Sequence, residues 1–542
     1  MRKIPLYILV ISLLSNCASV EKQNKFLETN LTLKEQLEDI NFLEKKIKKT
    51  QPSLYNFITE EQFNYKFDSL RKTIETPLKP SEFYYKVSPL LASIKQGHSI
   101  ISQTYTTPIP TKNETKKLNE KGLGPMSQFE FKWKNDKVYI ITNKSKDSSI
   151  KLGTEVVSIN EITPKKIYSK YRKSITSDGE NTTWIPHLLT KRFSTFMFYE
   201  VGMQDSLTYQ FKFNDSTFFK TIKRLPKDKK EIAKDVVKKD TLNKKPLVAT
   251  KEAKKAKAKE EKAKKRAERD KKFLYGYDLT KKEYVKTLNF IETDSLTAIL
   301  KIKNFSQGDY KSAYKEFFSL LRKKETQNLV LDLRGNPGGR LNDIQDLYAY
   351  LTSDSTFQLI EKTKVTRKSS LLMADYIKSV PKLAHLVVLP TYPIYASIML
   401  LKTKKADDGN YYFALASSKV KPHKANYFKG NIYVLIDGGS FSASCIISSK
   451  LKENKDIIFV GEETGGTFNG TVAGRRSTCS LPNSKLKTNL WIMDLIPTYK
   501  TNLEGRGIFP DIEIIPTIED IITNKDPEMD WIKEDIKKKN SP

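Results

Sequence analysis

Apolar residues in the first fifth of the chain recur every three or four positions, which is the spacing of one face of an α-helix. One such row is Leu33, Leu37, Ile40, Leu43 and Ile47, and a second is Phe63, Phe67, Leu70 and Ile74. Pro52 ends the first helix, and Pro77 and Pro80 end the second. A third helix is expected from Ser81, as its N-cap, to about Lys95. The pattern predicts a helical N-terminal domain over residues 25–110.

The pattern changes to strict alternation after residue 125, as in Phe129, Phe131 and Trp133, and this predicts β-strands. The run Ile150-Lys-Leu-Gly-Thr-Glu-Val-Val-Ser-Ile-Asn160 resembles the part of a PDZ domain where a glycine turn leads into a strand and an asparagine turn. Gly122-Leu-Gly124 resembles the carboxylate-binding loop of such a domain. We therefore expect a PDZ-like domain over residues 120–225, with a generic small β domain as the alternative.

Residues 285–520 alternate between buried strands and helices. The apolar strand Asn328-Leu-Val-Leu-Asp-Leu333 runs into the glycine-rich turn 334–339 and then a helix from about Leu341. Ile432-Tyr-Val-Leu-Ile436 runs into a second glycine-rich turn, followed by a helix from Phe441 to about Lys452. This alternation predicts an α/β core with a largely parallel sheet covered on both sides. The core is expected over residues 280–525, followed by a C-terminal tail at 526–542.

Glycine-rich turns of this kind place backbone N–H groups beside a helix N-terminus, where they stabilise negative charge. A tetrahedral oxyanion needs such donors, and a nucleophilic serine belongs beside them. Ser442 is expected in the first turn of its helix, which is a suitable place for a nucleophile. The spacing alone is more typical of a plain helix cap.

Three motifs occur in order: Val330-Leu-Asp-Leu-Arg-Gly-Asn-Pro-Gly-Gly339, Val434-Leu-Ile-Asp-Gly-Gly-Ser-Phe-Ser-Ala-Ser444 and Ile458-Phe-Val-Gly-Glu-Glu-Thr-Gly-Gly466. Together they resemble the carboxyl-terminal (tail-specific) processing peptidase family, which includes the tricorn core protease. The resemblance implies a crotonase-like (ClpP-like) peptidase core. It implies Ser442 as the nucleophile, and the N–H groups of Gly339 and Ala443 as the oxyanion hole.

Two departures decide which branch of that family the chain resembles. Family members of the Ser–Lys type have a lysine base where this chain has Thr467. Gln96-Gly-His-Ser99 instead resembles the histidine signature of the tricorn-like branch, which implies His98 as the base. The segment 502–511 resembles the glutamate-containing segment of that branch, which implies Glu504 as the orienting acid.

Each of these assignments has an alternative. His98 could be a hydrogen-bonded histidine that ends a helix, and Glu504 could be a loop carboxylate or a partner of Arg506. The tricorn core has a serine before its histidine that links it to the acid, and Gly97 has no side chain to do so. Cys445, three residues after Ser442, is expected to be a buried structural thiol rather than a rival nucleophile.

Other short-range contacts follow from the same motifs. Asp332 and Arg334 are expected to hold the oxyanion loop, either as an ion pair or through backbone contacts.

Cys445 and Cys479 are expected to be two separate buried thiols. The four histidines are far apart in the sequence, so no metal site and no cofactor are predicted.

The chain has 542 residues and a net charge of +32. Residues 227–272 alone hold 20 Lys and Arg against 9 Asp and Glu, so the excess is partly local. We interpret residues 226–275 as a Lys/Ala/Glu-rich low-complexity insert that cannot support a core. The insert is expected to be a solvated linker. Because no nucleic-acid module accompanies it, the alternative is a segment that binds anionic lipid or polysaccharide.

No interior stretch is expected to reach the length of a membrane span.

The N-terminus has the pattern of an export signal. Arg2 and Lys3 precede an apolar run from Ile4 to Leu14, and Cys17 follows. Leu14-Ser-Asn-Cys17 resembles a bacterial lipobox, which implies lipidation at Cys17 and a membrane-anchored lipoprotein in the cell envelope. The alternative is an ordinary cleaved signal.

These observations predict an exported serine-type endopeptidase that cleaves unstructured or C-terminal protein segments. One alternative is a catalytically inactive peptide- or ligand-binding lipoprotein on the same fold, since Thr467, Cys445 and Gly97 all depart from the family pattern. Another is a surface-binding protein that acts through residues 227–272. Neither the substrate nor the oligomeric state follows from the sequence.

Overall fold

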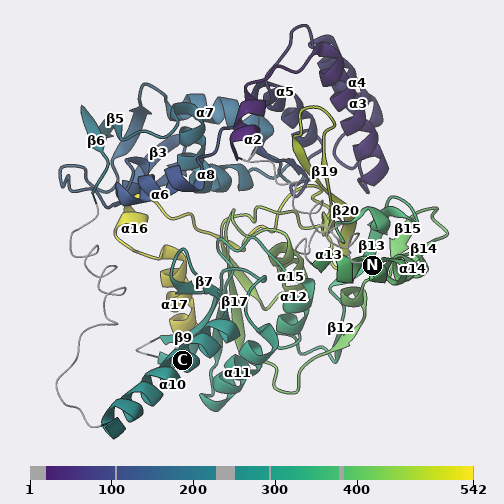
Figure 1. Ribbon diagram of the computed structural model, residues 1–542. Helices are drawn as coiled ribbons and strands as arrows, with labels where there is room; N and C mark the ends of the chain where they lie inside the picture. Colours follow the sequence, from purple (N-terminus) through teal and green to yellow (C-terminus); the bar gives the residue numbers. More distant parts are fainter. Residues whose placement is uncertain (1–19, 104–105, 227–250, 292–293, 377–383, 541–542) are drawn as a thin grey trace.

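The computed structural model describes residues 20–103, 106–226, 251–291, 294–376 and 384–540. The proposed lipidation site Cys17 and the first part of the Lys-rich insert, 227–250, lie outside these residues. The described chain is a mixed α/β structure with helices at the N-terminal end and two central sheets (Figure 1).

The N-terminal region is helical, as its periodicity predicts. Its helices are α2 (Val20–Leu27), α3 (Leu33–Thr50), α4 (Glu60–Lys72) and α5 (Pro80–Ala92). The predicted apolar rows of α3 and α4 pack into one cluster with α5, except for Leu33, which is exposed at the start of α3. The predicted start of the third helix is wrong: Lys79 is the N-cap and Pro80 is the first helical residue. Proline is well suited to that position because it needs no hydrogen-bond partner there.

An antiparallel sheet of five strands follows. In sheet order its strands are β2 (Phe129–Lys134), β3 (Lys137–Asn143), β4 (Glu155–Ile159), β5 (Ser206–Phe213) and β6 (Ser216–Lys223). The accompanying helices are α6 (Lys112–Glu120), η2 (Met126–Gln128), α7 (Pro164–Tyr171), η3 (Arg172–Ser174) and α8 (Trp184–Val201). The turn after β4 has positive φ at Asn160 and Glu161. A glycine would fit better than Glu161 at the second of these positions.

The second half contains a six-stranded sheet that is mainly parallel. Its order is β21 (Ile512–Glu513), β18 (Ile458–Gly461), β17 (Asn431–Ile436), β11 (Asn328–Asp332), β10 (Asp294–Ile302) and β9 (Lys286–Ile291). All neighbours are parallel except the β9–β10 pair. Both predicted strand–turn–helix units therefore lie side by side, because β11 pairs directly with β17.

Helices cover both faces of this sheet. On one face lie α11 (Tyr310–Lys323), α12 (Leu341–Tyr348) and α15 (Ala443–Leu451), and on the other lies α17 (Pro527–Asn540). Along β11, Leu329 and Leu331 face the first set, and Val330 faces α17. This two-sided burial explains why the strand is a continuous apolar run rather than an alternating one.

A second, antiparallel sheet joins the N-terminal helices to this core. Its order is β1 (Ile100–Ile101), β20 (Lys487–Pro497), β13 (Ile360–Val365), β15 (Tyr411–Phe413) and β14 (Thr403–Lys405), and β19 (Thr471–Ser480) also pairs with β20. β1 follows α5 directly and pairs Ile100 with Asn489. This pairing attaches the end of the N-terminal helical region to β20 of the antiparallel sheet.

Smaller elements complete the described chain. They are α10 (Lys251–Tyr275), β7 (Tyr277–Asp278), β8 (Glu283–Tyr284), β12 (Thr356–Phe357), η4 (Ser370–Met373), α13 (His385–Val388), η6 (Leu389–Thr391), α14 (Tyr392–Lys402), η7 (Ala416–Ser418), β16 (Lys421–Pro422) and α16 (Ile518–Ile522). The described part of the Lys-rich insert is thus the helix α10, which projects from the body (Figure 1).

One sequence expectation needs correction. The helical run His385–Lys402 is long and apolar enough to cross a membrane, by length and composition alone. The sequence pattern hid it because Pro390, Pro393 and two tyrosines interrupt the apolar residues.

Candidate active site

Ser442 lies between β17 and α15, at the N-cap of that helix. Its backbone has φ 58° and ψ −116°, a conformation that residues with a Cβ rarely adopt. Such strain persists only where the surrounding structure holds it, and it gathers at functional sites. The strained turn between a strand and a helix is also the position in which a nucleophile is presented at the edge of a sheet.

His98 lies in the turn between α5 and β1. Its ring packs between Phe441, at 4.8 Å between centroids, and Trp491, at 5.5 Å. The next residue, Ser99, is buried, and its hydroxyl oxygen accepts hydrogen bonds from Gln51 and from the backbone N–H of Trp491. The N-terminal helices and β20 therefore fix the position of this ring together.

The structure brings His98 and Ser442 together across 344 positions of sequence. The His98 Nε2 atom lies 2.9 Å from the Ser442 Oγ atom. Burial lowers the pKa of His98 to about 4. The imidazole is therefore neutral at neutral pH, which is the form that can accept the hydroxyl proton.

The other ring nitrogen of His98 leads to a carboxylate through a threonine. Its Nδ1 atom lies 3.1 Å from the Thr471 Oγ1 atom, and that hydroxyl donates to Asp178 Oδ2 at 2.9 Å. Because the threonine proton points to the carboxylate, Thr471 accepts from a protonated Nδ1. This tautomer leaves the Nε2 lone pair facing Ser442.

Asp178 lies in the loop between η3 and α8 and is buried. Its Oδ1 atom accepts from the N–H of Gly97 at 2.6 Å. Burial raises the pKa of Asp178 to about 6, against the effect of its two hydrogen bonds. A Cβ at position 97 would lie 2.8 Å from the Phe441 ring and 3.1 Å from Asp178 Oδ1. The glycine that breaks the family pattern thus makes room for the carboxylate.

The structure does not bring Glu504 to the histidine. Glu504 is exposed, and its carboxylate accepts from the Asn469 side chain at 2.9 Å. Arg506 does not pair with it either, because the guanidinium binds Glu463 in a bidentate arrangement. The structure therefore gives no support to Glu504 as the orienting acid, and the carboxylate that it links to His98, through Thr471, is that of Asp178. The Thr467 hydroxyl donates to the Gly470 carbonyl and is not part of the chain of hydrogen bonds from His98 through Thr471 to Asp178.

Of the two predicted oxyanion donors, Gly339 lines the same cavity as the serine, and Ala443 directly follows Ser442 in the chain. This cavity, of about 740 Å³, is lined by His98, Gly339 and Ser442 among others. Within the described chain, neither the Gly339 N–H nor the Ala443 N–H donates to a protein acceptor. The Gly338 N–H, in contrast, donates to the Asn336 side chain at 2.9 Å. Two N–H groups are thus left for a ligand oxygen beside Ser442.

Gly338 sets the distance between the two glycine-rich turns. Its φ is +93°, and a Cβ there would lie 2.7 Å from the Ala443 nitrogen and 2.9 Å from the Ser442 Cβ atom. The 336–339 turn therefore packs directly on the serine turn, and only a residue without a side chain allows this approach.

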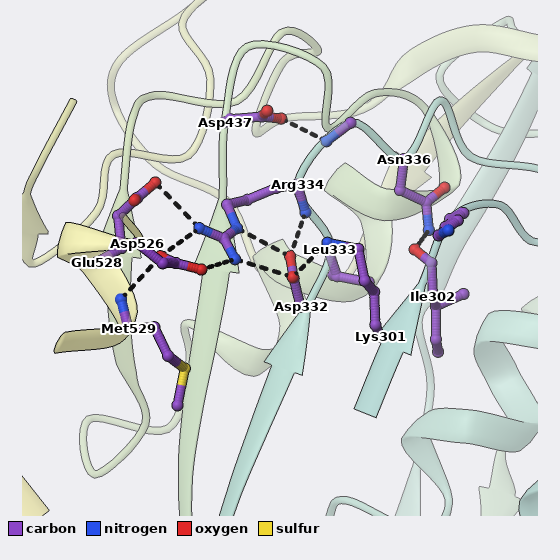
Figure 2. Close-up of polar contacts among 12 residues, drawn as sticks. Lys301, Ile302, Asp332, Leu333, Arg334, Asn336, Asp437, Asp526, Glu528 and Met529 are labelled. Carbon is purple, nitrogen blue, oxygen red and sulfur yellow. Dashed lines mark hydrogen bonds and ion pairs between the residues drawn. The ribbon is translucent and has the colours of Figure 1, made fainter. Parts of the chain in front are cut away.

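The base of the 334–339 turn is held by a charged network (Figure 2). Arg334 binds Asp332 Oδ2 at 3.0 Å and Asp526 Oδ1 at 2.9 Å. The Gly335 N–H donates to Asp437 Oδ1, at the start of the serine turn, at 2.7 Å. The expected contact between Asp332 and Arg334 is present as an ion pair and also as a backbone bond, from the Arg334 N–H to Asp332 at 3.1 Å.

Cys445 and Cys479, the two cysteines among the described residues, form no disulfide. Burial raises the pKa of Cys445 to about 12, and its sulfur donates to the Ser440 carbonyl at 3.3 Å. A thiol of this kind is not ionised at neutral pH, and the thiolate is the nucleophilic form of cysteine. Cys479 is partly exposed, so the expectation of two buried thiols is wrong for that residue.

A second cavity, of about 640 Å³, meets the first at His98. Its lining includes Trp184, Arg192 and Phe196 of α8, and Ile100 and Ile101 of the edge strand β1. The histidine and serine thus lie where two cavities join, beside a strand edge that can accept an extended chain. Among the described residues, no group of three or more His, Cys, Asp or Glu could hold a metal ion.

The comparisons with known proteins concern the family and the fold. The sequence model described as Peptidase family S41 matches residues 296–514, from within β10 to β21. The comparison with curated proteins gives no match. The crystal structure of mature CPAF superposes with a TM-score of 0.56 at 14% identity, over 90% of this chain and 94% of that one.

Mature CPAF complexed with lactacystin gives a TM-score of 0.57 at 14% identity, over 93% and 97% of the two chains. At this identity the likeness shows a mixed α/β fold shared with these structures, and residues 296–514 match the sequence model of peptidase family S41.

Proposed function

We propose that this protein is a serine-type endopeptidase with Ser442 as nucleophile and His98 as general base. The observation that carries the proposal is the 2.9 Å contact between His98 Nε2 and the Oγ of a serine held at φ 58°. Serine is a poor nucleophile until a base takes its proton, and general-base catalysis contributes about 10²–10⁴ in rate.

The reaction follows from the positions of these atoms. His98 Nε2 takes the proton of Ser442 while Oγ attacks the carbonyl carbon of a peptide bond. The oxyanion that forms is stabilised by the N–H groups of Gly339 and Ala443. The imidazolium then gives its proton to the leaving amine, and an acyl-enzyme remains. Water releases the acyl group by the same steps, with His98 again as the base.

Thr471 and Asp178 support the histidine in this proposal. A buried imidazolium is costly because burial disfavours the charged form. The Thr471 oxygen accepts from His98 Nδ1, and the Asp178 carboxylate orients the threonine hydroxyl. The four side chains form a relay that holds one tautomer and stabilises the charge that appears on the ring.

We further propose that the sheet β2–β6 with α8 acts as a PDZ-like module beside a crotonase-like core. A cavity of about 430 Å³ lies between the 122–127 loop and α8, and it is lined by Gly124 and Phe198 among others. Such a site suits the C-terminal end of an extended peptide, which adds to the sheet as a strand. The substrates would then be unstructured protein segments or protein C-termini, as in tail-specific cleavage of the tricorn-like type.

For its location, we propose export and lipid anchoring at Cys17, on the strength of the lipobox-like sequence alone. The protein would then act in the cell envelope on exported proteins.

The test uses the chain from Ala18 onward, a fluorophosphonate probe and an unstructured protein such as casein. Wild type should take the label and cleave casein, and Ser442→Ala and His98→Ala should do neither. Ser449→Ala is the matched control, because that hydroxyl binds the Ile446 carbonyl on the same helix, away from the site. Absence of both labelling and cleavage in folded wild type would favour the inactive binding protein.

A further inference from the structure

The helical run from His385 to Lys402 carries a large apolar surface on the outside of the molecule. Only 11% of this stretch is buried, and its mean hydropathy is 1.2. The side chains of Leu386, Val387, Leu389, Ile394 and Leu401 are exposed by 62, 74, 56, 65 and 75%. Ile398, between the last two on the same face, is exposed by 41%. We call this set the outer face.

The opposite side of the run is attached to the protein. Tyr395 and Met399 are buried, and the Tyr395 hydroxyl donates to the Leu371 carbonyl at 2.8 Å. Tyr376 stacks on Tyr395 with ring centroids 4.1 Å apart. The helix is therefore fixed along the surface of the core and cannot cross a bilayer as a separate span. Contiguous apolar surface of this kind marks an interaction site.

The charges around the outer face are all of one sign over a long stretch. Between Asp375 and Asp407 the sequence has no acidic residue, and it has lysines at 378, 382, 402, 404 and 405. Lys402, Lys404 and Lys405 are exposed at the end of α14 and along β14. An apolar surface bordered by lysines matches the acyl chains and anionic headgroups of a lipid surface.

We propose that the outer face inserts into the interface of an anionic membrane and holds the peptidase flat against it. A second copy of the chain fits this face less well. A contact between two copies would offer no anionic surface to Lys402, Lys404 and Lys405, which are exposed at the C-terminal end of the run. An anionic bilayer satisfies the apolar residues and the lysines at once.

The location of the run relates membrane binding to the active site. The Arg475 guanidinium lies over the Tyr395 ring at 5.5 Å, and Arg475 also lines the cavity that contains Ser442. Because Tyr395 is on the attached side of the run, a bilayer under the outer face would be separated from this cavity by the helix, which is about 10 Å thick. The segments brought to Ser442 would then be those that leave a membrane surface.

The experiment is vesicle flotation of the chain from Ala18 onward, which carries no lipid anchor. Vesicles of phosphatidylglycerol and phosphatidylcholine are compared with phosphatidylcholine alone. The wild type should float with the anionic vesicles. The variant I394Q/I398Q/L401Q should bind at least about tenfold more weakly, because each exposed side chain loses its transfer from water.

Matched controls separate this effect from general surface polarity and from misfolding. F219Q/L279Q/I515Q removes three exposed apolar side chains elsewhere and should float as wild type does. K402Q/K404Q/K405Q should weaken binding by about fivefold per lysine near the surface, and salt should reduce this difference. Circular dichroism and thermal melts check that every variant is folded.

The readout does not depend on catalysis, so failure of the peptidase proposal would leave this proposal standing. Wild type that stays at the bottom of the gradient with anionic vesicles overturns it. So does an outer-face variant that floats like wild type. If light scattering shows a wild-type dimer that the outer-face variant dissociates, the occupant is a second copy and the membrane assignment is wrong.

Discussion

Replacing Thr471 by valine tests the relay more sharply than replacing the serine. Valine has nearly the same shape as threonine but has no hydroxyl, so His98 Nδ1 and Asp178 Oδ2 each lose their bond to it. Hydrogen bonds to charged groups contribute about 1.5–3 kcal/mol. Losing this support for the imidazolium should lower kcat/KM by about 10- to 150-fold. The serine nucleophile and the oxyanion donors stay in place, so fluorophosphonate labelling should be slower but still present.

The pH dependence gives a second measure of the same relay. The pKa of Asp178 is raised to about 6, so its carboxylate is ionised above that pH and becomes protonated as the pH falls through it. The pKa of His98 is lowered to about 4, so the ring stays neutral through that window. Wild-type kcat/KM should therefore fall below about pH 6. In Thr471→Val this limb should move toward pH 4, because Asp178 no longer acts on the histidine.

The assay is cleavage of an internally quenched peptide from pH 4 to 9. Thr471→Ser should restore most of the rate, because it restores the hydroxyl. Thr467→Val is the matched control, since that hydroxyl binds the Gly470 carbonyl outside the relay. Glu504→Gln should also leave the rate unchanged. If Glu504→Gln is impaired and Thr471→Val is not, the relay is assigned to the wrong acid and the original glutamate assignment is correct.

Three further predictions concern the energetic cost of the site. Ser442→Gly should be more stable than Ser442→Ala by about 1 kcal/mol in urea unfolding, because glycine relieves the strain at φ 58°; equal stability would show that the turn stores no strain. Asp178→Asn should be up to about 3 kcal/mol more stable than wild type at pH 8 and lose this advantage toward pH 4. The raised pKa means that the wild-type fold is stabilised by protonation and loses stability as the pH rises from about 4 to about 6; a variant that is less stable at pH 8 would contradict this. Gly338→Ala should lose labelling and about 1–2 kcal/mol of stability, because its Cβ would lie 2.7 Å from the Ala443 nitrogen; an active, stable variant would show that the two turns can separate.

Local patterns predicted the elements that present the serine. Strand, glycine turn and helix follow one another within about twenty residues around Ser442, and the same unit occurs around Gly339. Burial on both faces makes each strand a continuous apolar run, which is visible without knowledge of the fold. The expectations that failed were also local. The sequence predicts a helix stop at Pro80, which is the first helical residue, and prolines interrupt the apolar pattern of the run 385–402.

Local patterns could not predict Asp178 as the carboxylate of the site, because its position depends on contacts between distant segments. Asp178 lies in a polar loop with no motif of its own. It is brought to the site where the Gly179 N–H binds the Lys95 carbonyl at 2.9 Å and the Asn181 side chain binds the Thr464 carbonyl at 2.6 Å. Glu504 has the more suggestive sequence, but its loop directs the carboxylate to Asn469.

Gly97 shows why a departure from a family pattern need not mean loss of function. A relay needs a hydroxyl within about 3 Å of the histidine Nδ1 atom and a carboxylate behind it, and no rule requires that hydroxyl to come from the neighbouring residue. Here the first residue of β19, Thr471, supplies it, and Asp178 approaches through the space that a side chain at position 97 would fill. Gly97→Ser should therefore fail to add a second hydroxyl, because its Cβ would meet the Phe441 ring at 2.8 Å and Asp178 Oδ1 at 3.1 Å. Gly97 and Thr471 therefore belong to one arrangement. A side chain at position 97 would fill the space through which Asp178 reaches the Thr471 hydroxyl.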